Sequence, residues 1–210
     1  KNNAINYLFE NLAFSDSFTG NKHHLFGNLK LKNISINFNN SILNNKTPFE
    51  KGTFSRYYIS SKYNLSKSWY GVALHGENNK RTEISTNLPL AISHKYNEIE
   101  AFFGVGDSTN VYTQFGANFR TTDSIQNTNF EQVNNSKTFY IKSTLLNTNT
   151  ANLKAYVNYR TVENTNFKDE ASLNSKIVYN QQLYNQFLNF NSSYQSLSGT
   201  LPQQDYTYIK

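Results

Sequence analysis

Apolar and polar residues alternate along much of this chain, which is the pattern of strands whose two faces meet different surroundings. Ile99, Ala101, Phe103 and Val105 fall on odd positions, while Glu98 and Glu100 fall on even positions. Residues 111–120 repeat this arrangement. No stretch shows a long apolar stripe with the period of a helix, so the chain is predicted to be all-β.

Paired runs joined by short turns rich in Asn, Asp, Gly and Ser predict four antiparallel hairpins. The paired runs are 54–65 with 69–75, 95–105 with 111–120, 138–146 with 152–160, and 173–182 with 187–194. An earlier pair lies within residues 25–38, where a change of phase at residues 32–33 suggests a β-bulge. Connections between hairpins are longer and polar, as in residues 121–137.

Short sequence matches recur about forty residues apart. They are Arg-Thr at Arg81, Arg120 and Arg160, Asn-Thr-Asn-Phe at 127–130 and 164–167, and Asn-Ser-Lys at 135–137 and 174–176. Their shared spacing indicates a structural period of one hairpin. The chain is therefore predicted to form a single β domain over residues 1–210, an up-and-down meander of about ten antiparallel strands.

One face of the predicted strands is apolar and changes in character along its length. Beside the short turns it carries aliphatic residues, whereas next to the long loops it carries Tyr57, Phe119, Phe139 and Tyr159. A row of aromatic residues bordering an apolar band is typical of membrane β-barrels, in which aromatic rings lie at the level of the lipid headgroups. These four side chains are predicted to form a lipid-facing aromatic rim.

The opposite face carries long and charged side chains, as a wide lumen would allow. The chain is therefore predicted to be an outer-membrane β-barrel, or a segment of a larger one, at the Gram-negative outer membrane or cell surface. Membrane lipid is its expected partner, and its expected role is that of a pore, a transport conduit or a surface-anchoring barrel.

Two alternatives stay open, because alternation alone does not distinguish lipid from a protein core. The first is a soluble extracellular β-sandwich that binds a carbohydrate or protein ligand, with Trp69 and Tyr70 stacking on the ligand. The second is a structural segment of a secretion or surface-assembly complex, whose sheet edges pair with envelope protein partners.

Composition agrees with an ordered chain that has little conventional core. Hydrophobic residues make up 37% and the mean hydropathy is -0.66, yet aromatic residues reach 15%. Disordered chains are poor in aromatic residues. The net charge of +6 comes from scattered Lys and Arg, so nucleic acid is not an expected partner.

No residue pattern indicates catalysis, a cofactor or a metal. Cys is absent, which excludes disulfides and thiolate metal sites. His23 and His24 are adjacent and point to opposite faces of a strand. Glu98 and Glu100 lie on one strand, whereas glycosidase carboxylates face each other across the scissile bond. The chain is predicted not to be an enzyme.

The C-terminal stretch SGTLPQQDYTY at residues 198–208 resembles one found in large cell-surface proteins of Bacteroidetes, and residues 172–175 and 179–181 are similar to the same proteins. The resemblance, mainly over residues 170–208, implies a much longer outer-membrane β-barrel chain in the Gram-negative envelope. It implies no functional residue. The chain has no signal-peptide pattern, no Met and no terminal aromatic strand ending, so it is expected to be an internal segment of a longer protein.

Overall fold

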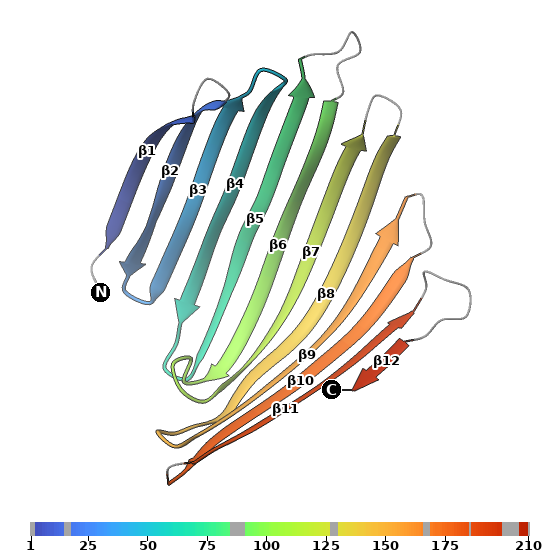
Figure 1. Ribbon diagram of the computed structural model, residues 1–210. Coiled ribbons are helices and arrows are strands. Elements are labelled where there is room, and N and C mark those ends of the chain that lie inside the picture. The colour runs from blue at the N-terminus through green and yellow to red at the C-terminus, as the bar shows by residue number, and fades with distance from the viewer. Residues whose placement is uncertain are drawn as a thin grey trace. The chain divides into compact units, whose positions relative to one another are not determined.

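The computed structural model describes residues 3–14, 18–84, 91–126, 130–165, 169–184, 186–198 and 206–209. Its strands form one sheet, in which each strand pairs with its neighbours in sequence (Figure 1). They are β1 (Ala4–Phe14), β2 (Phe18–Leu31), β3 (Ile34–Lys46), β4 (Glu50–Asn64), β5 (Ser68–Glu83), β6 (Ala91–Gly106), β7 (Tyr112–Gln126), β8 (Phe130–Asn147), β9 (Ala151–Asn164), β10 (Glu170–Leu183), β11 (Gln186–Ser198) and β12 (Tyr206–Ile209).

The prediction of an all-β antiparallel meander is confirmed, with twelve strands in the described part of the chain instead of the expected ten or so. The chain divides into two compact units. Unit 1 comprises Lys1–Tyr63, Val72–Ile99 and Arg120–Asn134, and unit 2 comprises Asn64–Gly71, Glu100–Phe119 and Asn135–Lys210. Among the described residues, no helix is long and apolar enough to cross a membrane.

Residues 32–33 form a turn between β2 and β3, so the predicted bulge is wrong. Leu31 pairs directly with Ile34, and Lys32 adopts a left-handed conformation with φ of 50°. A reversal of chain direction shifts the apolar phase just as an inserted residue does, which is why the sequence pattern did not separate the two. Tyr184 has φ of 56° in the β10–β11 connection.

The strands are longer than the apolar pattern predicts. Residues 121–137 were expected to be a polar loop, but β7 continues to Gln126 and β8 begins at Phe130. Likewise β5 continues to Glu83. Because a ladder satisfies the backbone groups whatever the side chains are, pairing extends past the apolar region into polar sequence. The Asn-Thr-Asn-Phe matches and the 198–208 stretch lie partly outside the described residues.

The turn between β6 and β7 follows the sequence prediction at residues 106–110. Gly106 has a φ of 102°, and the Asp107 amide donates to the Val111 carbonyl at 2.8 Å. One carboxylate oxygen of Asp107 accepts hydrogen bonds from the Thr109 hydroxyl at 2.7 Å and the Thr109 amide at 2.9 Å. These bonds hold the pKa of the exposed Asp107 carboxyl below its ordinary value of 3.8.

Acidification is expected to loosen this turn. The lowered pKa means that the ionised carboxylate stabilises the turn at neutral pH, and that this contribution is lost as the pH falls through the folded-state pKa, below 3.8. Amide hydrogen exchange at Thr109, corrected for its intrinsic pH dependence, should therefore speed up as the pH is lowered below about 4. Asp107→Asn should abolish this dependence. An unchanged pH response in that variant would contradict the assignment to Asp107.

Candidate functional site: two faces of one sheet

In unit 1, register places apolar side chains together on one face of β1 to β4, because residues directly opposite on paired strands share a face. One cross-strand row is Ile5, Gly27, Phe38 and Ile59, and the next is Tyr7, Leu25, Asn40 and Tyr57. Most of the large apolar side chains in these rows are exposed. We call this side the apolar face and the opposite side the polar face.

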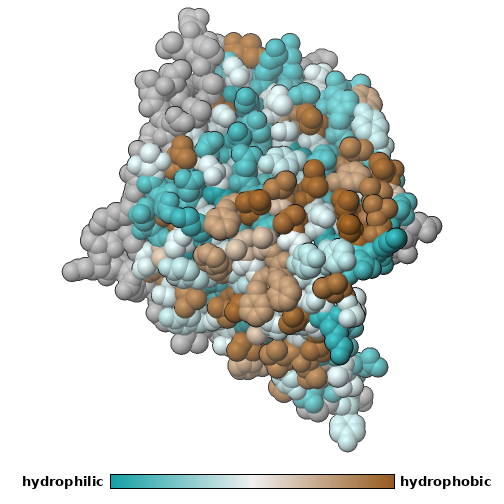
Figure 2. All heavy atoms as spheres, turned by 180° about the vertical axis from the view of Figure 1, so that it is seen from behind, coloured by the Kyte–Doolittle hydropathy of each residue, from teal (hydrophilic) through white to brown (hydrophobic). Residues whose placement is uncertain are grey.

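Unit 2 has the same arrangement. In β9 to β11 the rows are Tyr159, Leu173 and Ser196, then Val157, Ser175 and Tyr194, then Ala155, Ile177 and Ser192, then Leu153, Tyr179 and Phe190. In β7 and β8 the alternation shows directly in the burial of neighbours. Phe115 and Ile141 are exposed, while Gln114 and Tyr140 are buried. Figure 2 shows hydrophobic residues gathered in the middle and lower part of the face that it presents.

The four residues of the predicted rim lie on the apolar face and are exposed: Tyr57 by 38%, Phe119 by 45%, Phe139 by 53% and Tyr159 by 46%. The Phe119 and Phe139 rings pack edge to face, with centroids 6.5 Å apart. The strands continue well past these residues towards the longer connections, since β4 begins at Glu50 and β7 ends at Gln126. The aromatic residues therefore lie inside the strands, whereas the sequence pattern places them at the strand ends.

The polar face of unit 1 holds a chain of charged groups. Glu98 lies 3.4 Å from His75 Nε2 and 3.9 Å from a guanidinium nitrogen of Arg120, and the Glu98 side chain is only 11% exposed. The guanidinium carbon of Arg120 in turn lies 3.8 Å from the centroid of the Tyr96 ring, which is the geometry of a cation–π contact. The Glu98 carboxylate is therefore paired with His75 and Arg120 on the polar face of the sheet.

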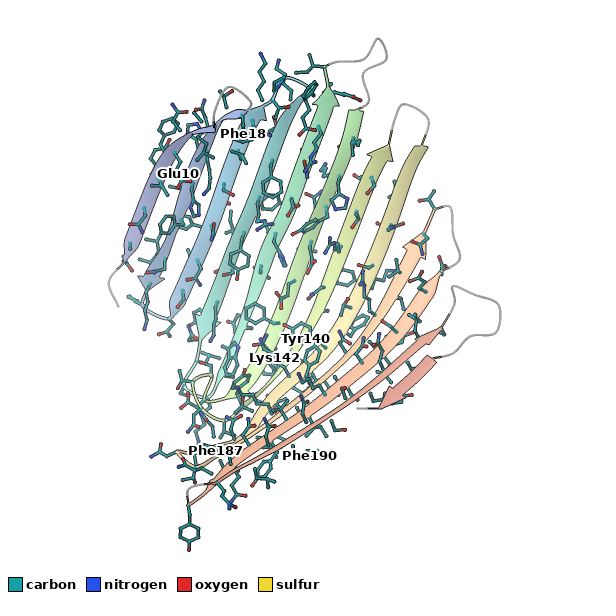
Figure 3. The ribbon with its side chains drawn as sticks, in the orientation of Figure 1. Glu10, Phe18, Tyr140, Lys142, Phe187 and Phe190 are labelled. Atoms are coloured by element: carbon teal, nitrogen blue, oxygen red, sulfur yellow. The ribbon has the colours of Figure 1, made fainter. Side chains whose placement is uncertain are left out.

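The polar face of unit 2 carries two aromatic rings that lie over glycines. Trp69 covers Gly104, and Tyr140 covers Gly116 so closely that a Cβ at either glycine would overlap the ring. The Tyr140 hydroxyl donates to a Glu100 carboxylate oxygen and accepts from Gln114 Nε2 at 2.9 Å. Figure 3 shows Tyr140 with Lys142 nearby on the same strand. Glu100 is therefore hydrogen-bonded to a buried tyrosine.

Glu98 and Glu100 share a face as the sequence predicts, but each has its own set of partners. Glu98 is held by Arg120 and His75, and Glu100 by Tyr140. Among the described residues, no group of three His, Cys, Asp or Glu is placed to hold a metal ion. The arrangement provides fixed charges and hydrogen-bonding groups along the polar face.

Trp69 and Tyr70 do not form a common platform for a ligand. Trp69 is 4% exposed and packs edge to face against Tyr112, with ring centroids 5.7 Å apart. Tyr70, one residue on, points to the opposite face and is 49% exposed. The Trp69 ring fills the space above Gly104, so it has little surface left for stacking on a sugar.

His23 and His24 lie on opposite faces, as adjacent strand residues must. His23 Nδ1 is 2.7 Å from the Tyr7 hydroxyl on the apolar face, and His24 Nε2 donates to Asn39 Oδ1 at 2.8 Å on the polar face. Each imidazole therefore has its own cross-strand partner.

Comparison with known proteins gives only remote similarities. No protein-family model matches the chain, and no curated protein matches it. Among solved structures, the β domain of the Bordetella autotransporter BrkA is 9% identical with a TM-score of 0.45, covering 98% of this chain and 93% of that one. The translocator domain of the autotransporter NalP from Neisseria meningitidis is 9% identical with a TM-score of 0.37, covering 86% and 74%.

A third similar structure is a loop-deletion mutant of OmpT, an outer-membrane protein of Vibrio cholerae. It is 10% identical with a TM-score of 0.39, covering 99% of this chain and 97% of that one. All three similarities are too remote to establish a relationship.

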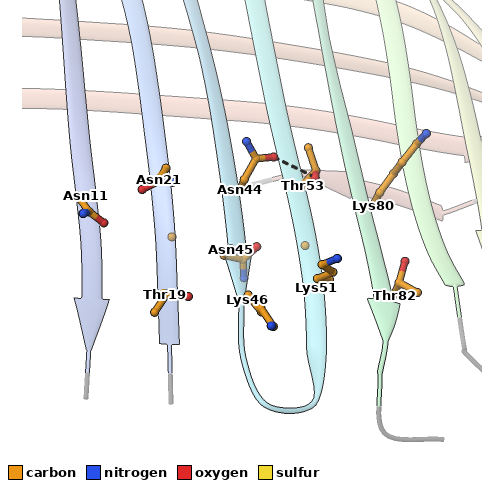
Figure 4. A pocket seen from close by; sticks show the side chains of 12 residues that line it. Asn11, Thr19, Asn21, Asn44, Asn45, Lys46, Lys51, Thr53, Lys80 and Thr82 are labelled. Carbon is orange, nitrogen blue, oxygen red and sulfur yellow. Dashed lines mark hydrogen bonds between the residues drawn. The ribbon is translucent and has the colours of Figure 1, made fainter. Parts of the chain in front are cut away.

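One feature of unit 1 was not predicted from the sequence. A hollow of about 720 Å³ lies near the ends of β1 to β5, close to the turn between β3 and β4 (Figure 4). It is lined by Asn11, Thr19, Gly20, Asn21, Asn44, Asn45, Lys46, Lys51, Gly52, Thr53, Lys80 and Thr82. The sequence contains the Asn clusters that line this hollow, but only the cross-strand register brings them together. We call this feature the Asn-Lys hollow.

Proposed function

We propose that the chain is a membrane-spanning part of an outer-membrane β-barrel that acts as a pore or transport conduit. The apolar face would contact lipid, and the polar face would line a water-filled interior. Soluble proteins rarely expose a large continuous apolar patch, whereas a membrane barrel requires an apolar band on its outer face.

The balance of exposed and buried apolar residues carries this proposal. Among the described residues, the buried hydrophobic side chains are Trp69, Ala73 and Tyr140 alone. Large hydrophobic side chains on strand after strand stay exposed, among them Phe9, Ile59, Phe103 and Phe139. A soluble chain of this length would bury a core of Leu, Ile, Val and Phe.

Strand dimensions support the same function. In β3 the apolar face runs from Ile34 to Ile42, a rise of about 26 Å at 3.3 Å per residue. At the tilt of about 40° usual for barrel strands, this length covers about 20 Å of the roughly 25 Å height of the apolar band of an outer-membrane barrel. Nearly all the strands also exceed the roughly nine to eleven residues that a tilted membrane strand needs.

The absence of Cys from the sequence makes single-site spin labelling direct. We expect a nitroxide at Phe139→Cys to be accessible to oxygen in lipid bilayers, because oxygen concentrates in the hydrocarbon. A nitroxide at Lys142→Cys, on the polar face of the same strand, should instead be accessible to a water-soluble nickel chelate. Electron paramagnetic resonance measures both accessibilities in one sample type.

Heat-modifiable migration after extraction in detergent is the accompanying fold control. The proposal fails if both labels are equally accessible to the nickel chelate in bilayers. It also fails if the chain remains a monomer in buffer without detergent.

A further inference from the structure

The Asn-Lys hollow lies on the apolar face of unit 1, beyond the end of the apolar band. Asn11, Asn21, Asn44 and Thr53 form one cross-strand row, and Ala13, Thr19, Lys46 and Lys51 form the next row outward. In Figure 4 the Asn and Thr side chains of the first row lie side by side across four strands, and the Thr53 hydroxyl donates to Asn44 Oδ1 at 3.1 Å. Amide and hydroxyl groups in this arrangement are suited to sugar hydroxyls.

Positive charge gathers at the same place. Lys46 and Lys51 stand directly opposite each other across β3 and β4, an arrangement of like charges that destabilises a sheet. Lys80 on β5 adds a third ammonium group to the lining. None of the three lysines forms a salt bridge with another described residue. A bound anion would relieve the repulsion between Lys46 and Lys51.

The cross-strand row next to the Asn row, towards the middle of the strands, is the first row of the apolar band. It contains Phe9, His23, Ile42 and Ser55, followed by the row of Tyr7, Leu25, Asn40 and Tyr57. By register and alternation, the apolar face of β1 to β4 carries no Asp or Glu among the described side chains. A ligand that occupies the hollow therefore finds cationic and amide groups at one end and apolar side chains directly beside them.

We propose that the Asn-Lys hollow binds the headgroup of a phosphorylated glycolipid, whose acyl chains lie along the adjacent apolar band. This inference rests on the proposed membrane location. Lys46, Lys51 and Lys80 pair with the phosphate, and the Asn and Thr side chains bind the sugar hydroxyls. The volume of about 720 Å³ lies within the range of roughly 300–1,000 Å³ that is usual for ligand sites. The continuity of charge with an apolar band selects a lipid over a free sugar phosphate.

The connections at the end of unit 1 that holds the hollow are those expected on the outer-leaflet side of an outer-membrane barrel. At the end of unit 1 that holds the hollow, residues 15–17, 47–49 and 84–90 connect the strands, whereas at the opposite end the two-residue turn at residues 32–33 connects β2 and β3. Outer-membrane barrels have short turns on the periplasmic side and longer loops outside.

The test uses the full chain folded in non-ionic detergent, with lipid A as the phosphorylated glycolipid and native mass spectrometry as the readout. The triple variant Lys46→Gln, Lys51→Gln and Lys80→Gln should bind lipid A at least about tenfold more weakly, since charge-assisted bonds to phosphate are lost. The matched control is Lys142→Gln, Lys154→Gln and Lys176→Gln, which removes the same charge from the polar face. It should bind lipid A as the unaltered chain does.

Two further measurements distinguish binding of a glycolipid phosphate from binding of a free phosphate ion or of lipid in general. Phosphatidylcholine, which has no net charge, should bind equally to all variants, and millimolar inorganic phosphate should not displace lipid A. Displacement by inorganic phosphate would overturn the glycolipid assignment, because the site would then take a free anion. Equal weakening in the control variant would overturn it as well, since general attraction to positive charge would explain the binding.

Folding is checked in each variant by heat-modifiable migration. If the triple variant does not fold, Lys80→Gln alone should still weaken lipid A binding severalfold, and unchanged binding there would overturn the proposal. The spin-label experiment contains no lipid A. Failure of the membrane location and failure of this site are therefore distinguished.

Discussion

Replacing Ile177 with Arg is expected to lower the free energy of unfolding by about 2–4 kcal/mol in bilayers, the usual cost of a cation on the lipid face near the midplane. Ile177 lies in the middle of β10 on the apolar face, is 47% exposed, and stands between Ala155 and Ser192. Urea titration of the chain folded into lipid vesicles, followed by fluorescence and by heat-modifiable migration, measures the loss.

The same residue change at Asn180 is the matched control. Asn180 is exposed on the polar face of the same strand, where an added guanidinium stays hydrated, so Asn180→Arg should change stability by less than about 1 kcal/mol. An exposed surface position in a soluble protein would tolerate either change. Equal stabilities for the two variants would therefore remove the main support for a lipid-facing side.

The second large effect concerns the glycine beneath Tyr140. Gly116→Ala should destabilise the fold by about 2–4 kcal/mol, because the added Cβ occupies the space of the ring and off-rotamer repacking is costly. Displacement of Tyr140 also leaves Glu100 and Gln114 without the hydroxyl that they share, and unsatisfied buried polar groups add to the loss. Chemical denaturation in detergent or vesicles measures the change.

A double-mutant cycle tests whether the ring is the cause. In the Tyr140→Ala background the space above Gly116 is empty, so adding Gly116→Ala should cost less than about 1 kcal/mol, and the two changes should be strongly non-additive. Tyr140→Phe keeps the ring and removes only the hydroxyl, which isolates the hydrogen bonds to Glu100 and Gln114. Additive effects of Gly116→Ala and Tyr140→Ala would show that the glycine acts through something other than this ring.

Strand identity and facing were readable from the sequence because side chains alternate with a period of two whatever the neighbouring strands do. Tyr57, Phe119, Phe139 and Tyr159 were placed together on the apolar side from that period alone, and the four hairpins followed from their turn residues. The ends of the strands were not readable, since segments such as residues 121–126 pair through their backbone and carry no apolar signal.

Cross-strand partners depend on register and spatial proximity, which local sequence does not encode. Nothing near Gly116 in the sequence indicates that Tyr140 covers it, and nothing near Glu98 indicates Arg120. The Asn-Lys hollow likewise arises only when Asn11, Asn44 and Lys80 are brought side by side. The sequence by itself therefore determined an all-β meander with one apolar face, because those properties are local and periodic. Only the tertiary structure decided which side chains meet, because each such meeting joins residues from different strands.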